Sequence, residues 1–489
     1  MGLSLQSNKF HGVINEIPLP PLLKDFGVSD NHFSGPFPTN FFRNSSVYFI
    51  DLTDNDFDGL LPIPPPTVQY LSVANNKFGG DIPYELCNAT ELYLINLSNN
   101  SFTGTIPPCF PNLNLSVLDL RANKFVGQIP DIFPPGNILR TIRLSQNRLG
   151  GTVPRSLVHC KELEVLDLSE NELGGRFPHW LDTFPNLQVL VLRSNKFHGP
   201  VKSSSKSDHP FPKLRIFDLS NNRLSGPLPA KYIAKLKAMK NEERSGLHYM
   251  NENSYCKDAI EVVIKGMEIE LVKILTIFTT IDFSSNCFGG EIPELIGDLK
   301  ALKGLNFSHN NLTGSIPSSV GNLTNLEWLD LSSNKLNGKI PGELADVTFL
   351  TTLNLSNNLL SGPIPKGPQI DTFVHSFDGN PGLCGHPLPT ACGLDGLQSP
   401  PTTSPAEEEE EESAHWIEWR AVAIGYGSGL VIGISAGYIM LEIGRPRWLV
   451  RMVERWLVRM VERKRRRKTT RPKRDAAPRN HPRRSTRGQ

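Results

Sequence analysis

The chain has 489 residues, including 40 Gly and 40 Pro, with 20% charged residues and a formal net charge of +2. This composition excludes a wholly disordered chain, so Gly and Pro are expected to mark turns. The charge is unevenly divided: residues 442–489 contain 18 Lys and Arg against 4 Asp and Glu, whereas the preceding 441 residues have a balance of −12. Such an asymmetry on either side of an apolar stretch is typical of a membrane protein.

One asparagine recurs along the chain, mostly every 23 or 24 residues, and it marks a repeat. The same pattern surrounds each copy, as in LEVLDLSENELGGRFP and LEWLDLSSNKLNGKIP. Fourteen copies exclude chance: Asn8, Asn31, Asn55, Asn76, Asn100, Asn123, Asn147, Asn171, Asn195, Asn222, Asn286, Asn310, Asn334 and Asn358. The repeat predicts a structure that grows by adding coils.

The positions within one repeat have separate physical tasks. Leu166 and Leu168 alternate with a polar residue, which predicts a short strand with one buried face. Asn171 is expected to turn inward and bond backbone groups of adjacent coils. Because one repeat cannot bury its apolar edge alone, the coils must stack. The sequence therefore predicts an α/β-type leucine-rich-repeat solenoid, a curved superhelix with a parallel β-sheet on its concave face.

Residues 230–277 interrupt the repeats. A basic, helix-prone stretch, KYIAKLKAMKNEER, precedes AIEVVIKGMEIEL. The alternation on both sides of Lys265 and Gly266 predicts a β-hairpin with Gly266 in its turn. A decayed repeat is the alternative, and it explains the alternation less well.

The extension Leu-x-Gly-x-Ile-Pro resembles the plant-specific class of leucine-rich repeats, over residues 1–392. This class occurs in receptor-like kinases, receptor-like proteins and secreted polygalacturonase inhibitors. Ten repeats in 1–229, the island at 230–277 and four repeats in 278–370 resemble plant receptor-like proteins without a kinase, such as the tomato leaf-mould resistance proteins. KGMEIELVKILTIFTTIDFSSNCFGGEIP and SFDGNPGLCGHPLPTAC carry that likeness.

The resemblance implies further features at both ends of the repeats. It implies a C-terminal cap at 371–397, closed by a disulfide between Cys384 and Cys392; the other five cysteines are isolated in the sequence. Family members begin with a signal peptide and an N-terminal cap, whereas this chain begins inside a repeat and residues 1–25 contain no apolar signal core. The expectation is an N-terminally truncated member or an incomplete gene model, with an exposed apolar edge on the first coil.

The C-terminal part predicts membrane attachment. An acidic spacer at 398–420 precedes residues 421–441, which are uncharged and long enough to form one transmembrane helix. The basic tail at 442–489 is expected in the cytosol. The resemblance implies that the membrane is the plasma membrane. This tail is too short for a kinase domain, and its duplicated RWLVRMVE has no assigned role. Four glycines at steps of four predict a helix-packing face: Gly425, Gly429, Gly433 and Gly437. The resemblance implies that this face binds a single-pass adaptor kinase.

Unusual residues at outward positions of the strands are candidates for recognition. Aromatic and Arg side chains often dominate binding energy, although singly exposed ones are also common. The ligand-binding candidates are Tyr48, Tyr70, Tyr93, Arg140, Arg143 and Arg193. Trp328 lies in the last four repeats, where the resemblance implies contact with a co-receptor kinase.

Nine Asn-x-Ser/Thr sequons are candidate N-glycosylation sites: Asn44, Asn88, Asn96, Asn99, Asn114, Asn306, Asn311, Asn322 and Asn354. The repeat itself produces Asn-Leu-Ser, so three of them, Asn96, Asn306 and Asn354, fit the strand template without any glycan. The candidates on the variable segment, Asn44, Asn88 and Asn322, are stronger.

No catalytic constellation stands out, and we expect no enzymatic activity, cofactor, metal site or nucleic-acid partner. The function predicted is a plant cell-surface receptor-like protein. Its ectodomain would bind a peptide, protein or glycan, and it would signal through partner receptor kinases, in defence against pathogens. The alternatives are a developmental peptide co-receptor, a truncated decoy, and a binding protein like the polygalacturonase inhibitors.

Overall fold

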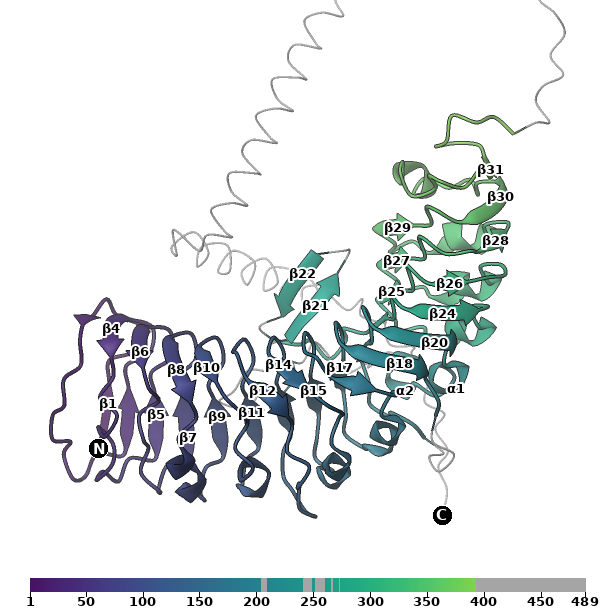
Figure 1. Ribbon diagram of the computed structural model, residues 1–489. Helices are drawn as coiled ribbons and strands as arrows, with labels where there is room; N and C mark the ends of the chain where they lie inside the picture. Colours follow the sequence, from purple (N-terminus) through teal and green to yellow (C-terminus); the bar gives the residue numbers. More distant parts are fainter. Residues whose placement is uncertain (204–208, 241–248, 251–259, 265–266, 272, 393–489) are drawn as a thin grey trace, which may run out of the picture. The chain divides into compact units, whose positions relative to one another are not determined.

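The computed structural model describes residues 1–392, except 204–208, 241–248, 251–259, 265–266 and 272. All of these residues lie within one compact unit, 1–398. Within this unit the repeats form successive coils of a solenoid (Figure 1). The predicted leucine-rich-repeat solenoid with a parallel sheet is therefore confirmed.

Each coil contributes one three-residue strand to a long sheet of 14 strands, in which every strand pairs in parallel with that of the next coil. Its strands, in spatial order, are β1 (Gly2–Ser4), β3 (Asp25–Gly27), β5 (Phe49–Asp51), β7 (Tyr70–Ser72), β9 (Leu94–Asn96), β11 (Val117–Asp119), β13 (Thr141–Arg143), β15 (Val165–Asp167), β17 (Val189–Val191), β19 (Ile216–Asp218), β23 (Thr280–Asp282), β25 (Gly304–Asn306), β27 (Trp328–Asp330) and β29 (Thr352–Asn354). The middle residue of each strand faces the core, as Leu166 does in β15.

The Leu-x-Gly-x-Ile-Pro segments form strands as well. They pair in parallel with their neighbours as four short sheets. These strands are β2 (His11–Gly12), β4 (His32–Pro36), β6 (Asp56–Gly59), β8 (Lys77–Asp81) and β10 (Ser101–Thr103); β12 (Val126–Gln128) and β14 (Arg148–Gly150); β16 (Gly174–Gly175), β18 (Lys196–Pro200), β20 (Arg223–Pro227), β24 (Cys287–Gly290) and β26 (Asn311–Leu312); and β28 (Asn337–Gly338), β30 (Leu359–Pro363) and β31 (Gly382–Cys384).

Short 3₁₀ helices follow the second strand in many coils and return the chain toward the long sheet. Most of them begin directly after a proline, whose fixed φ suits the start of a helical turn. They are η1 (Tyr84–Asn88), η2 (Phe110–Asn112), η3 (Arg155–His159), η4 (His179–Thr183), η5 (Glu294–Asp298), η6 (Ser318–Asn322), η7 (Gly342–Asp346) and η8 (Ile370–Thr372).

The recurring asparagines form the predicted ladder between coils. The Nδ2 atom of Asn171 donates to the carbonyl of Leu144 in the preceding coil at 2.9 Å, and to Ser169 O at 3.0 Å. Its Oδ1 atom accepts from Leu149 N at 3.0 Å. Since buried backbone groups without partners are costly, each asparagine stabilises the bend after its strand.

Phenylalanines at the second apolar position extend the core through the early coils. Phe57, Phe78, Phe102 and Phe125 stack in succession, with ring centroids 6.2, 6.4 and 6.3 Å apart. All four side chains are fully buried. They form part of one continuous apolar core that runs through the coils.

The island at 230–277 leaves the stack and returns to it. Strand β19 pairs directly with β23, so the coils on either side of the island are neighbours. The island begins with two short helices, α1 (Ala230–Ile233) and α2 (Lys237–Lys240). It continues into an antiparallel pair, β21 (Ile260–Ile264) and β22 (Met267–Leu271), which confirms the predicted hairpin.

The end of the stack is covered by the segment around Cys384. Strand β31 pairs with β30, and Phe377 and Leu383 are buried in the core. Asn380 donates to Leu355 O at 3.0 Å and accepts from Leu360 N at 3.1 Å, so it continues the ladder. Asn380 is not among the fourteen asparagines identified from the sequence, because this segment keeps the asparagine without the leucines that precede it in most of the other repeats.

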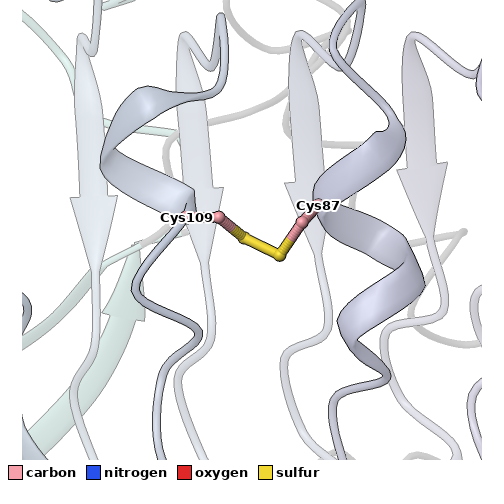
Figure 2. Close-up of a disulfide and its surroundings, with 2 residues drawn as sticks. All are labelled: Cys87 and Cys109. Carbon is pink, nitrogen blue, oxygen red and sulfur yellow. A yellow bond between two sulfur atoms is a disulfide. The ribbon is translucent and has the colours of Figure 1, made fainter.

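Two disulfides are present among the residues that the structure describes. Cys384 and Cys392 are joined, as the resemblance implied. Cys87 and Cys109, which the sequence reading took as isolated, are also joined, with Cα atoms 5.8 Å apart. Figure 2 shows this bond linking the short helical segments of two adjacent coils. Their separation of 22 residues, about one repeat, was the signal that could have revealed the pair.

Candidate functional site

The outward face of the long sheet has a regular geometry. Because the strands are paired in register, equivalent residues of successive coils form continuous rows. Side chains on these rows face away from the core, where a ligand can reach those that nothing else covers. The character of the rows changes between the early and the central coils.

The early coils present aromatic side chains. Tyr48 and Tyr93 are 40% and 47% exposed and occupy equivalent positions just before β5 and β9. Tyr70 stacks on Phe49 with centroids 4.3 Å apart, and both rings are half-buried. Exposed Gln69 lies between Tyr48 and Tyr93 in the same row. These five residues are called the open sheet surface below.

The central coils carry apolar residues at outward positions, and the island covers them. The four residues are fully buried: Val165, Val189, Val191 and Ile216. They form a second apolar cluster with Met250, Ile260, Val262 and Ile274 from the island. Figure 1 shows the β21–β22 hairpin beside the central strands of the long sheet. Burial of this apolar area is the main force that holds the hairpin in place.

Polar contacts surround that apolar cluster. Glu261 and Glu270 stand directly opposite each other in the hairpin, an arrangement that is unfavourable for two carboxylates. Each one lies close to an arginine of the sheet. Arg121 is 3.2 Å from Glu270, and Arg193 is 3.9 Å from Glu261, which also accepts from Gln146 Nε2 at 2.8 Å. Cations of the sheet thus offset the repulsion within the hairpin.

A small notch separates the hairpin from the early coils. It has a volume of about 200 Å³. Its lining is almost entirely polar: Asn75, Asn99, Arg121, Ala122, Ser145, Gln146, Glu261 and Glu270. The notch belongs to the coils of β7 to β13, so it adjoins the open sheet surface along the same face. Together they make an exposed surface with an apolar aromatic part and a polar end.

Two of the arginine candidates are not exposed, so the expectation of exposure at these positions was wrong. Arg143 is 2% exposed and pairs with Asp119 at 3.0 Å. Arg193 is 3% exposed and pairs with Glu170 at 2.8 Å, beneath the hairpin. Arg140 remains partly exposed and is bonded to Glu164 at 2.6 Å. Contact of these three residues with a ligand remains a prediction.

Trp328 is also buried, contrary to the expectation of an exposed aromatic. It is 4% exposed and stacks on Phe278 of the island exit, with centroids 6.0 Å apart. Its indole occupies the space above Gly304, where any side chain would collide with it. Trp328 therefore packs the island exit against the later coils, and its contact with a co-receptor remains a prediction.

Two adjacent carboxylates, Asp218 and Asp282, lie buried in one row. Burial, and after it the neighbouring Asp218, raise the pKa of Asp282 to about 7, against the opposing effect of the hydrogen bonds that Ser284 and Asn306 donate to it. Burial likewise raises the pKa of Asp218, while Ser220 and Arg193 oppose the shift. These groups stabilise the central coils most when they are protonated.

The sequon asparagines differ in their surroundings. Asn44, Asn88 and Asn322 are exposed, as the stronger candidates should be. Asn99, Asn114 and Asn311 are exposed as well. By contrast, Asn306 is half-buried and donates to Asp282 at 3.1 Å, through the nitrogen that a glycan would modify. Asn96 and Asn354 occupy the same row and bond Ser98 and Ser356 through Oδ1. Glycosylation at all nine positions stays a prediction.

The predicted membrane segment at 421–441, its four glycines and the basic tail lie outside the described residues. Within the part of the chain that the structure describes, no helix has the length and apolar character needed to cross a membrane. Membrane attachment therefore stays a prediction from sequence.

Comparisons with known proteins identify the repeat. Leucine rich repeat models match residues 138–197, 279–336 and 300–360, and single-repeat models match 67–89, 91–113, 114–135 and 213–231. Two proteins of Arabidopsis thaliana, Receptor-like protein 35 and Receptor-like protein 53, are 41% and 42% identical over 110 residues. That segment is 22% of this chain and 11% of each relative.

Solved structures of plant receptors share the fold. The Arabidopsis receptor kinase HAESA, in complex with the peptide hormone IDA and the co-receptor SERK1, is similar with a TM-score of 0.60 and 29% identity. The alignment covers 81% of this chain and 63% of that one. The plant peptide hormone receptor RGFR1, in complex with RGF2, has a TM-score of 0.53 and 25% identity, with 76% and 61% covered. The chain thus spans less than two thirds of either.

Proposed function

The chain is a leucine-rich-repeat protein of the plant receptor-like type, and we propose that it binds an extended peptide on the open sheet surface. The observation that carries the proposal is the row formed by Tyr48, Gln69 and Tyr93, with the Phe49–Tyr70 stack beside it. Exposed aromatic side chains on a rigid sheet supply contact area with little loss of side-chain entropy. The notch at the hairpin supplies amides, an arginine and two carboxylates for polar groups of the peptide.

A peptide fits this surface better than a compact globular ligand for a geometric reason. The outward rows run from coil to coil, so an extended chain can contact several coils with successive side chains. The hairpin bounds the surface at one end. The two similar receptors in complex with peptide hormones support this choice of ligand class.

Alanine variants of the two exposed tyrosines test this proposal. The probe is a 12-residue peptide selected on the full chain from a random phage-displayed library. We expect Tyr48→Ala and Tyr93→Ala each to weaken binding about tenfold or more, because each removes a large apolar contact. Affinity measured by biolayer interferometry reports the change.

Tyr84→Ala is the matched control. Tyr84 is 72% exposed but lies in η1, away from the long sheet, so this variant should keep full affinity. A selection that yields no binding peptide contradicts the proposal. So does a peptide whose affinity both sheet variants leave unchanged.

We further propose that residues 421–441 cross the plasma membrane and that the protein signals through partner kinases. The glycine stripe from Gly425 to Gly437 supports close packing of this helix with a partner helix. A co-receptor kinase would contact the last four repeats, in line with the co-receptor present in the HAESA complex. The resemblance of the island and cap to resistance proteins favours a role in defence.

The glycine stripe can be tested by co-purification of a membrane kinase from plant tissue. Gly429→Leu together with Gly433→Leu should reduce the recovered kinase more than tenfold, because the larger side chains keep the helices apart. Gly427→Leu together with Ser435→Leu changes small residues off the stripe and should leave recovery unchanged. Equal recovery with both double variants would exclude the stripe as the packing face.

A further inference from the structure

A groove lies on the side of the coils opposite the long sheet. It has a volume of about 690 Å³, within the range of small-ligand sites. Three successive coils line it. The first contributes Thr152, Val153 and Arg155, the second contributes Arg176, Phe177, Pro178, His179, Trp180 and Thr183, and the third contributes Pro200, Lys202 and Ser203. We call it the back groove.

The back groove is strongly basic. Arg155, Arg176 and Lys202 line it, one from each coil, together with His179. Among the described residues, those that line it include no Asp or Glu. Within the described part of the chain, none of these three cations forms an ion pair, whereas Arg121, Arg140, Arg143 and Arg193 all do. Three cations around one hollow repel each other unless an anion joins them.

The floor and walls of the back groove carry flat apolar surfaces. Trp180 is half-buried and is held by an edge contact with Phe184, with ring centroids 6.2 Å apart. Pro200, which is half-buried, lines the groove as well. Such ring faces accept the flat apolar face of another ring.

The island holds two walls of the back groove together. The hydroxyl of Tyr232, which is fully buried in α1, lies 3.1 Å from the carboxylate of the buried Asp182 of η4 and 3.1 Å from the carbonyl of Lys202, and it shares its one hydrogen between these two acceptors. The coil of η4 and the segment after β18 are therefore tied to the same side chain. A ligand would enter a hollow whose walls are already in position.

We propose that the back groove binds a short oligosaccharide that carries carboxylate groups. Arg guanidinium groups match a carboxylate with two parallel hydrogen bonds, and Lys202 adds a third cation. Trp180 and Pro200 contact the apolar faces of the sugar rings. The volume of about 690 Å³ is large enough for a short oligosaccharide. This site is separate from the open sheet surface and does not depend on the peptide proposal.

The experiment uses trigalacturonate as the probe and isothermal titration calorimetry on the full chain. Trigalacturonate should bind, with an affinity that falls as salt is raised, because the contacts are ionic. Maltotriose, a neutral sugar of the same length, should bind at least tenfold more weakly. A trigalacturonate affinity no greater than that of maltotriose would overturn the proposal.

Variants test whether binding depends on the residues of the back groove rather than on positive charge elsewhere on the surface. Arg155→Gln combined with Arg176→Gln should weaken trigalacturonate binding at least tenfold, and Trp180→Leu several-fold. Arg223→Gln is the matched control, because this exposed arginine of β20 lies outside the groove. Unchanged binding in the double variant, with its melting temperature preserved, would refute the site.

A tripeptide of glutamate tests whether the back groove prefers an acidic sugar or an acidic peptide. It carries three side-chain carboxylates but no sugar rings, so it should bind more weakly than trigalacturonate and should not respond to Trp180→Leu. Equal affinity for both would overturn the assignment to a sugar. Tyr93→Ala should leave trigalacturonate binding unchanged, which distinguishes failure here from failure of the peptide proposal.

Discussion

The early and central coils share one backbone pattern, yet their outward faces differ. In the coils of β5 to β9, Tyr48 and Tyr93 remain exposed. In the coils of β15 to β19, Val189 and Ile216 occupy outward positions and are fully buried by the island. An outward position in a repeat is therefore exposed only where no other segment covers it. The island divides one sheet into a covered part and an available part.

The largest effect is expected from a charge placed in the covered part. Val189→Asp would bury a carboxylate without a partner, at a cost of roughly 3–5 kcal/mol. The hairpin should leave the sheet, and amide exchange at Ile260–Ile264 should accelerate by about 100-fold or more. Hydrogen–deuterium exchange measured by mass spectrometry reports this directly.

Val126→Asp is the control for that variant. Val126 is 41% exposed in β12, so the same change there should shift stability by no more than about 0.5 kcal/mol. If hairpin exchange is equally slow in Val189→Asp and the native chain, the apolar cluster does not hold the hairpin.

A second difference between the two parts is their response to pH. The pKa of Asp282 is about 7 in the folded chain, against an ordinary value of 3.8, so the folded state binds more protons between these limits. Its contribution is therefore fully present below about pH 3.8 and is lost as pH rises toward 7. Within that window the contribution falls by at most about 1.4 kcal/mol per pH unit.

Asp282→Asn should remove most of this pH dependence, as measured by the urea unfolding midpoint between pH 5 and 7.5. The fold tolerates asparagine in this row, because Asn306 and Asn354 make the same bond to a serine two residues later. If the variant shows the same pH slope as the native chain, Asp282 is not the responsible group. Peptide affinity at the open sheet surface should not follow this titration.

The smallest effect is expected at the edge of the hairpin. Arg121→Gln removes the contact with Glu270, which is half-exposed and therefore screened by water. The cost should be about 0.5 kcal/mol, seen as a two- to threefold increase in amide exchange within β22. Lys77→Gln removes the exposed pair with Asp56 far from the hairpin and should leave that exchange unchanged. A tenfold increase in Arg121→Gln would mean that charge, rather than apolar burial, dominates docking.

Much of the fold follows from local pattern. The period of the asparagines predicts the coils, and the alternation of Leu166 and Leu168 predicts a strand. The alternation around 260–271 predicts the hairpin. These features depend on neighbours within one or two coils, which the sequence displays directly. The sequence pattern did not reveal Asn380 or the Cys87–Cys109 disulfide. Asn380 keeps the asparagine of the repeat, and the two cysteines keep its spacing.

The candidate site was less predictable. Tyr48 and Tyr93 were identified from residue type, and the structure leaves them exposed. Arg193 and Trp328 were chosen by the same criterion and are covered. The unusual valine and isoleucine residues at outward positions of the central coils were the sequence signal that could have distinguished the covered candidates from the exposed ones. Apolar residues in such rows indicate a covering segment.

By itself the sequence determined the repeat, the parallel sheet, the asparagine ladder and the existence of a hairpin, because each arises from contacts at a fixed spacing along the chain. Only the tertiary structure decided where the hairpin docks, which outward residues it buries and which stay exposed. Glu261 contacts Gln146 across 115 residues, and no local pattern encodes that separation. The available surface of this protein is set by where the island packs on the sheet, since burial depends on everything that packs against a residue.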